Sequence, residues 1–132
     1  MLRILVIDDE PLIRSLMVTI LTRAGFSLEE ASDGVMGLAM FQKYPSDMVI
    51  TDVFMPNRDG LEVLIELKHS YPHTKIIAMT GGGQSGMREI GSTAKMLGAA
   101  YVLHKPFERT SLLAAVHGAL GTAPQPVSQQ GA

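Results

Sequence analysis

The stretch MVITDVFMPNRDG, residues 48–60, decides the fold. Its apolar side chains run directly into Asp52, and three further apolar residues lead into a tight turn at residues 56–60. A continuous apolar run is typical of a strand that is buried on both faces of a parallel sheet. A carboxylate at the end of such a run is costly to bury unless something compensates its charge. The stretch therefore predicts a buried strand that ends in a compensated Asp52.

Four other apolar runs occur along the chain at roughly even spacing. Together with the first they predict strands at residues 2–7, 27–31, 48–51, 75–79 and 100–103. The segments between them have helical periodicity, and the alternation predicts an α/β fold with a parallel sheet covered by helices on both faces. The ends of these parallel strands should open on one crevice.

Three of the helical segments carry clear apolar rows. The expected core positions are Leu12, Leu16, Ile20, Ile13, Met17 and Leu21 in the first helix, Leu61, Leu64, Ile65 and Lys68 in the third, and Leu112, Leu113, Val116 and Leu120 in the last. Asp59 and Glu62 have the spacing of a capping box at the start of the third helix. Gly121 is expected to end the last helix.

Composition narrows the class of protein. The chain has 132 residues, which suits one domain, with 46% hydrophobic and 18% charged residues and a formal net charge of -2. Its Lys and Arg residues are scattered, so no nucleic-acid or membrane surface is indicated. Cysteine is absent and no apolar stretch could cross a bilayer. We therefore expect a soluble cytoplasmic domain over residues 1–121, followed by a disordered tail or linker stub at 122–132.

Polar residues follow four of the predicted strands. The first strand leads into Asp8, Asp9 and Glu10, the third into Asp52, the fourth into Thr80 and the fifth into His104 and Lys105. The topology brings these strand ends together. Clustered carboxylates repel one another unless a cation intervenes, and Mg²⁺ (or Mn²⁺) with oxygen ligands would answer that need. With Lys105 and the metal beside it, Asp52 becomes a candidate nucleophile toward phosphorus, with Thr80 as a hydroxyl donor.

The chain resembles the receiver domain of bacterial response regulators. The resemblance is carried by ILVIDDEP at 4–11, MVITDVFMPNRDG at 48–60, IIAMTG at 76–81 and GAAYVLHKPF at 98–107, in that order. It implies a flavodoxin-like sheet in the order 2-1-3-4-5 with five helices. It also implies a two-component signalling function, in which the domain is a phosphoacceptor and not an enzyme acting on a separate substrate.

The resemblance further implies roles for individual residues. Asp52 would accept a phosphoryl group from a histidine of a sensor kinase or phosphotransfer protein. Asp9, Asp52 and the backbone carbonyl of Phe54 would bind the metal directly, and Asp8 would act through water. Thr80 and Lys105 would hold the phosphoryl group. The Lys105–Pro106 peptide bond would be cis. A downstream protein would read the switched surface, and phosphorylation could drive homodimer formation.

Three features depart from the family pattern. Val102 stands at the position of the family's aromatic switch residue, and Tyr101, one place earlier, should point to the opposite face of the strand. The glycine-rich loop 81–86 and the helix after it, which Gly91 weakens, are expected to be mobile. Phe54 stands where the family tunes the lifetime of the phosphoryl group, and an apolar ring there predicts slow hydrolysis.

Each motif has a simpler alternative when it is taken alone. The acids 8–10 suit a helix N-terminus before Pro11, Lys105 could be a solvated surface charge, and residues 81–83 could be a plain connection. The four histidines lack metal-ligand spacing, which favours surface or helix-end roles. Rival functions are a haloacid-dehalogenase-like phosphatase, whose nucleophile–acid spacing is poor here, a docking module that is not phosphorylated, and a nucleotide site at the glycine run, the weakest of the three.

Overall fold

Five parallel strands form one sheet. The computed structural model describes residues 2–53, 60–81 and 87–121. The strands are β1 (Arg3–Ile7), β2 (Ser27–Ala31), β3 (Met48–Asp52), β4 (Lys75–Gly81) and β5 (Tyr101–Lys105). They pair in the order β2-β1-β3-β4-β5, which confirms the predicted topology. β4 and β5 run two residues further than predicted because their ladder continues through Thr80 opposite His104 and Gly81 opposite Lys105.

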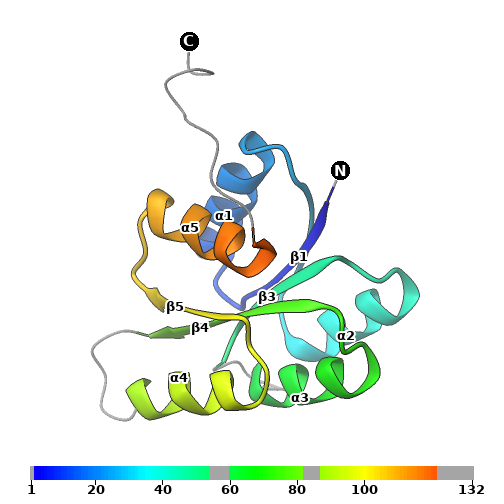
Figure 1. Cartoon of the computed structure of the whole chain (residues 1–132). Helices are drawn as coiled ribbons and strands as arrows, with labels where there is room; N and C mark the ends of the chain where they lie inside the picture. Colours follow the sequence, from blue (N-terminus) through cyan, green and yellow to red (C-terminus); the bar gives the residue numbers. More distant parts are fainter. Residues whose placement is uncertain (1, 54–59, 82–86, 122–132) are drawn as a thin grey trace.

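Five helices cover the sheet. They are α1 (Pro11–Arg23), α2 (Gly34–Lys43), α3 (Gly60–Ser70), α4 (Met87–Met96) and α5 (Arg109–Leu120). Figure 1 shows α1 and α5 on one face and α2, α3 and α4 on the other. The two helical layers therefore bury the central strands β1 and β3 from both sides, as their unbroken apolar runs require.

The sheet separates two hydrophobic cores. Successive strand residues point to opposite faces, so Ile4 and Val6 of β1 contact the layer of α1 and α5, whereas Leu5 and Ile7 contact the layer of α2 and α3. The carboxyl ends of the central strands emerge between these layers, and this is the place where the predicted site residues lie.

The apolar rows of two helices are corrected by the structure. In α1, Leu12 and Leu16 are 85% and 46% exposed, because only the row of Ile13, Met17 and Leu21, with Ile20, faces the sheet. A buried stripe needs only part of the helix circumference, and the second row lies outside it.

In α3 the buried residues are Val63, Leu64 and Leu67, and Ile65 is exposed. Lys68 is half-buried because its stem lies where a Cβ of Gly98 would contact it, while its ammonium donates to the carbonyl of Pro72. The predicted α3 face was therefore rotated by about one position.

The helix ends follow local chemistry. Asp33 caps α2, since its Oδ1 accepts from the backbone N–H of Met36 at 2.8 Å. Gly121 ends α5 in the left-handed region, with φ of 74°, as predicted. The Asp59 half of the proposed capping box, the loop 82–86 and the tail 122–132 lie outside the described residues, so the expectations about them stay predictions.

Within the ranges that the structure describes, no helix combines the length and the apolar character needed to cross a membrane.

Candidate functional site

Four carboxylates meet at the carboxyl ends of β1 and β3. One oxygen from each of Asp8, Asp9, Glu10 and Asp52 lies within 4.8 Å of the others. Asp8 and Asp52 are buried, whereas Asp9 and Glu10 are exposed. The strand order places Asp52 beside the end of β1, so the predicted convergence of these acids is present in the fold.

Lys105, the last residue of β5, supplies the positive charge of the cluster. Its Nζ lies 2.7 Å from Asp52 Oδ2, 2.8 Å from Asp8 Oδ2 and 3.2 Å from Glu10 Oε1. The Lys105–Pro106 peptide bond that follows is cis. The ammonium therefore bridges the two buried carboxylates, which compensates Asp52 as the sequence suggested.

Burial and charge interactions oppose each other at both Asp8 and Lys105, and the net result is a raised pKa for each group. Burial raises the pKa of the Asp8 carboxyl, and the Lys105 ammonium and the Glu10 backbone N–H only partly offset that rise. Burial by itself lowers the pKa of Lys105, but its hydrogen bond to Asp52 and its charge interactions with Asp52 and Asp8 outweigh burial and raise it. The lysine is thus held in its charged form, and Asp8 is the acid that the site leaves least satisfied.

The loop after β1 is held by its own backbone and by one arginine. The N–H of Glu10 donates to Asp8 Oδ1 at 2.8 Å. Arg14 donates from Nη1 to the carbonyl of Asp8 at 2.7 Å and from Nε to Glu30 at 3.0 Å. Arg14 was not among the predicted site residues. A residue one turn after Glu10 is near enough to reach this loop, but whether it does so depends on how α1 leaves the loop.

Gly60 fixes the backbone behind Asp52. A Cβ at Gly60 would overlap the backbone carbonyl oxygen of Asp52 and would crowd Val53. The Gly60 N–H also donates to the carbonyl of Val53 at 3.2 Å. The start of α3 can therefore pack directly on the end of β3 only because residue 60 lacks a side chain.

The donor set fits a hard divalent cation. Asp8 Oδ2 is buried and, among the described residues, has an ionic contact with Lys105 but no hydrogen bond of acceptable geometry. Oxygen ligands from two or more carboxylates, with open positions on the exposed side of Asp9, are what Mg²⁺ or Mn²⁺ prefers. Phe54, the predicted source of a carbonyl ligand, lies outside the described residues.

Thr80 has an unexpected partner. Its side chain is fully buried near the end of β4, and its Oγ1 shares a hydrogen bond with Nδ1 of His104 at 2.9 Å. Thr80 and His104 are direct neighbours in the β4–β5 ladder. The histidines were expected in surface or helix-end roles, and the pairing of Thr80 with His104 was not predicted because it depends on the register of β4 against β5.

Comparison with known proteins assigns the family. The model of the family described as "Response regulator receiver domain" matches residues 4–117. This chain belongs to the response regulator receiver domains. The receiver domain is 33% identical over 119 residues to the transcriptional regulatory protein TrcR of Mycobacterium tuberculosis, covering 90% of this chain and 45% of that protein. It is 33% identical to the chemotaxis protein CheY of Halobacterium salinarum, covering 89% of this chain and 96% of CheY.

Solved structures agree with this assignment. A response regulator receiver domain protein from Clostridium thermocellum superimposes with a TM-score of 0.84 at 33% identity, covering 92% of this chain and 95% of that one. Chemotaxis protein CheY4 of Vibrio cholerae gives 0.79 at 32% identity, covering 89% and 97%. The receiver domain spans about half the length of several curated relatives, such as TrcR and MprA, and nearly all of CheY. Receiver domains in general work with histidine kinases and downstream effectors in two-component signal transduction.

Two residues of β5 face opposite ways in this receiver domain. The Tyr101 ring lies against Gly118 of α5, where a Cβ would be 3.5 Å from its Cε2. Val102 faces α4, with its Cγ1 3.3 Å from the Cβ position of Gly91. Val102 thus occupies the side on which the switch residue was expected, and Tyr101 lies on the other. Gly91, which the sequence marked only as a weak point of α4, is buried and allows α4 to approach β5 closely.

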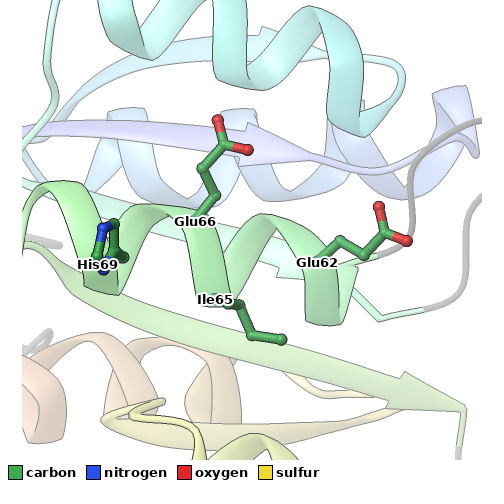
Figure 2. Close-up of a pocket in the computed structure, with 4 residues that line it drawn as sticks. All are labelled: Glu62, Ile65, Glu66 and His69. Atoms are coloured by element: carbon green, nitrogen blue, oxygen red, sulfur yellow. The ribbon is translucent and has the colours of Figure 1, made fainter.

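A separate shallow pocket of about 320 Å³ lies on α3 of the receiver domain. Figure 2 shows its four lining side chains, Glu62, Ile65, Glu66 and His69, projecting from successive turns of the helix, with Glu66 directed towards α2. Gln42 of α2 donates to Glu66 at 3.5 Å. Of the predicted site residues that the structure describes, none lines this pocket, so it is separate from the carboxylate cluster.

Proposed function

We propose that this receiver domain accepts a phosphoryl group on Asp52 from the phosphohistidine of a sensor kinase or phosphotransfer protein, and that the modification switches a protein-binding surface. One observation carries the proposal. A half-exposed cluster of four acids contains a buried aspartate whose Oδ2 lies 2.7 Å from a lysine ammonium. A purely structural ion pair would not need the two further exposed acids beside it.

The transfer is a displacement at phosphorus. A carboxylate oxygen of Asp52 forms the new P–O bond, the P–N bond to the donor imidazole breaks, and the electron pair returns to that nitrogen, which takes up a proton. Lys105 is placed to pair with a phosphoryl oxygen, since its Nζ already contacts the Asp52 carboxylate. Thr80 would donate its hydroxyl proton to another oxygen. Phosphoryl transfer depends chiefly on such positioning and charge neutralisation.

Mg²⁺ or Mn²⁺ would be held by Asp9 and Asp52 directly, by the backbone carbonyl of Phe54, and by Asp8 through water. When bound, the cation neutralises phosphoryl charge in the transition state. The Oδ2 atom of Asp8, which lacks a hydrogen bond among the described residues, supports a role through water, because a water bound to the cation could donate a hydrogen bond to it.

Phosphorylated domains would signal from the cytoplasm to a downstream protein, and dimerisation of the phosphorylated form is part of the proposal. We propose neither direct nucleic-acid binding nor membrane binding for this domain. The domain would assist its own phosphotransfer and its own dephosphorylation without a separate substrate.

Incubation with acetyl phosphate and Mg²⁺, followed by intact mass measurement, tests the proposal. We expect one phosphate adduct on the wild type and none on Asp52→Asn. Asp47→Asn is the matched control, since Asp47 is an exposed aspartate at the opposite end of β3 and should leave the adduct intact.

An adduct on both Asp52→Asn and the wild type would place the phosphoryl group elsewhere and reject the assignment of Asp52. Absence of an adduct on the wild type, with metal shown to be bound, would reject the function. Sustained turnover of a small phosphate ester would instead support the phosphatase alternative.

A further inference from the structure

The hydroxyl of Thr80 has a hydrogen-bond partner of its own in the structure. Thr80 is fully buried, and its Oγ1 lies 2.9 Å from Nδ1 of His104. A hydroxyl carries a single proton, although it can accept further hydrogen bonds. The proton that Thr80 gives to an unprotonated Nδ1 cannot at the same time be given to a phosphoryl oxygen. When Nδ1 is the unprotonated ring nitrogen, His104 and the phosphoryl group therefore compete for one donor.

The His104 ring lies next to α4, so a change in its hydrogen bond to Thr80 would alter its contact with that helix. A hollow of about 200 Å³ is lined by Gly91, Ser92, Lys95, Val102 and His104, at the junction of α4 and β5. His104 itself is exposed, and its Cε1 lies 3.9 Å from the Cβ position of Gly91. The small side chain of Val102 and the missing side chain of Gly91 leave this space beside the ring.

We propose that His104 is the positioning residue that couples Thr80 to α4 in this receiver domain. The inference rests on the proposed function, because it concerns how a phosphoryl group on Asp52 is read. In the unmodified domain the ring accepts the Thr80 proton. When Thr80 donates its proton to the phosphoryl group, the His104 ring has two options. It can donate Nδ1–H to the Thr80 oxygen, or it can rotate into the hollow. The first changes the protonated nitrogen of the ring that lies against α4, and the second changes the position of that ring.

Competition between His104 and the phosphoryl group for the Thr80 proton predicts a change in the affinity for a phosphoryl mimic. Replacing His104 by Leu frees the Thr80 proton, so beryllofluoride, a phosphoryl mimic, should bind about fivefold more tightly in the presence of Mg²⁺, the worth of one hydrogen bond. In a Thr80→Val background the same His104→Leu change should have no effect on beryllofluoride affinity. A purely structural role of His104 would give equal effects in both backgrounds, so the double-mutant cycle separates the two accounts.

Proton–nitrogen correlation spectra of the histidine rings give a direct readout on the full chain. Beryllofluoride with Mg²⁺ should shift the Nδ1 signal of His104 in the wild type and in Thr80→Ser, and should leave it unchanged in Thr80→Val. His69, which is exposed on α3, serves as the internal reference, and His69→Leu is the control variant for affinity. His104→Asn keeps a polar group near the position of Nδ1 and should restore much of the wild-type affinity.

These experiments distinguish a failure of the proposed function from a failure of the inference about His104. If the wild type binds no beryllofluoride and forms no adduct with acetyl phosphate, the proposed function falls and the inference with it. If it binds beryllofluoride but the His104 signal stays fixed, or if His104→Leu acts equally with and without the Thr80 hydroxyl, the inference alone is overturned. Because His104 is an exposed residue of an edge strand, these variants are expected to fold, which the same spectra would report.

Discussion

At the scale of single residues, Lys105 joins charges that would otherwise repel. It contacts Asp52 and Asp8, which are both buried. Lys105→Ala should lower the free energy of unfolding of the metal-free protein by about 3 kcal/mol, because it leaves two buried carboxylates facing each other without a cation. Urea unfolding in EDTA measures the loss.

Lys75→Ala, which alters an exposed lysine at the start of β4, is the control and should change stability little. Added Mg²⁺ should restore part of the stability lost in Lys105→Ala. An unchanged urea midpoint in EDTA would mean that the ion pair contributes nothing net.

Replacement of Asp8 should raise stability, whereas replacement of Lys105 should lower it. Burial raises its pKa, so the native state keeps the Asp8 proton to a higher pH than the unfolded chain does. Wild-type stability is therefore lost as the pH rises from the ordinary Asp pKa through the raised one. Asp8→Asn escapes this loss and should be more stable than the wild type at pH 7, by about 1.4 kcal/mol for each unit of pKa difference.

Urea unfolding in EDTA across the acidic range measures this effect. The advantage of Asp8→Asn should shrink as the pH falls below the ordinary Asp value, since both chains are then neutral at residue 8. A variant that is less stable than the wild type at neutral pH would contradict the raised pKa of Asp8.

At the scale of elements, the contact between the end of β3 and the start of α3 sets the position of Asp52. Gly60→Ala places a methyl group on the Asp52 carbonyl oxygen, so either the strand end or the helix must move. We expect a loss of about 2 kcal/mol in the free energy of unfolding, as for other overpacked positions, and weaker Mg²⁺ binding by titration.

Gly81→Ala is the matched control, because a Cβ there meets no atom of the described residues within 4 Å. If the two alanine variants bind Mg²⁺ alike, the packing of α3 on β3 does not determine the metal site.

The elements also show where sequence reasoning stops. The parallel sheet, the convergence of Asp8, Asp9, Asp52 and Lys105, and the end of α5 at Gly121 followed from periodicity and from the rule for parallel sheets. The order of the strands came from the resemblance to receiver domains. Which of two apolar rows faces inward in α1 did not follow from periodicity, because both rows have the same local spacing. Leu12 and Leu16 were misplaced for that reason.

Two contacts between different elements could not be predicted from the sequence either. The Thr80–His104 bond depends on the register of β4 against β5, and the reach of Arg14 back to Asp8 depends on how α1 leaves the loop. Both are set by packing between elements, which no single stretch of sequence specifies.

At the scale of the whole molecule, cation binding should be linked to global stability. The candidate ligands come from the ends of β1 and β3 and are held by Lys105 from β5, so a cation bound there is bound only by the folded chain. Mg²⁺ at 100 times its dissociation constant should add about 2.7 kcal/mol and raise the melting temperature by on the order of 10 °C.

Asp9→Asn should lose most of this shift, and Asp47→Asn, at the opposite end of β3, should keep it. Differential scanning calorimetry with and without Mg²⁺ checks the linkage. A melting temperature that does not depend on Mg²⁺ would exclude a site of this kind at the concentrations used.

The ion pairs of Lys105 have a consequence for the protein during its synthesis. Glu10 and Asp52 lie 95 and 53 residues before the lysine that contacts them. On a ribosome, both acids emerge long before that lysine does, and a chain interrupted ahead of β5 has no ammonium to offer them. Under the proposed function, a chain that ends before β5 therefore lacks the ammonium that would pair with a phosphoryl oxygen on Asp52. We expect such a chain not to be phosphorylated by the kinase.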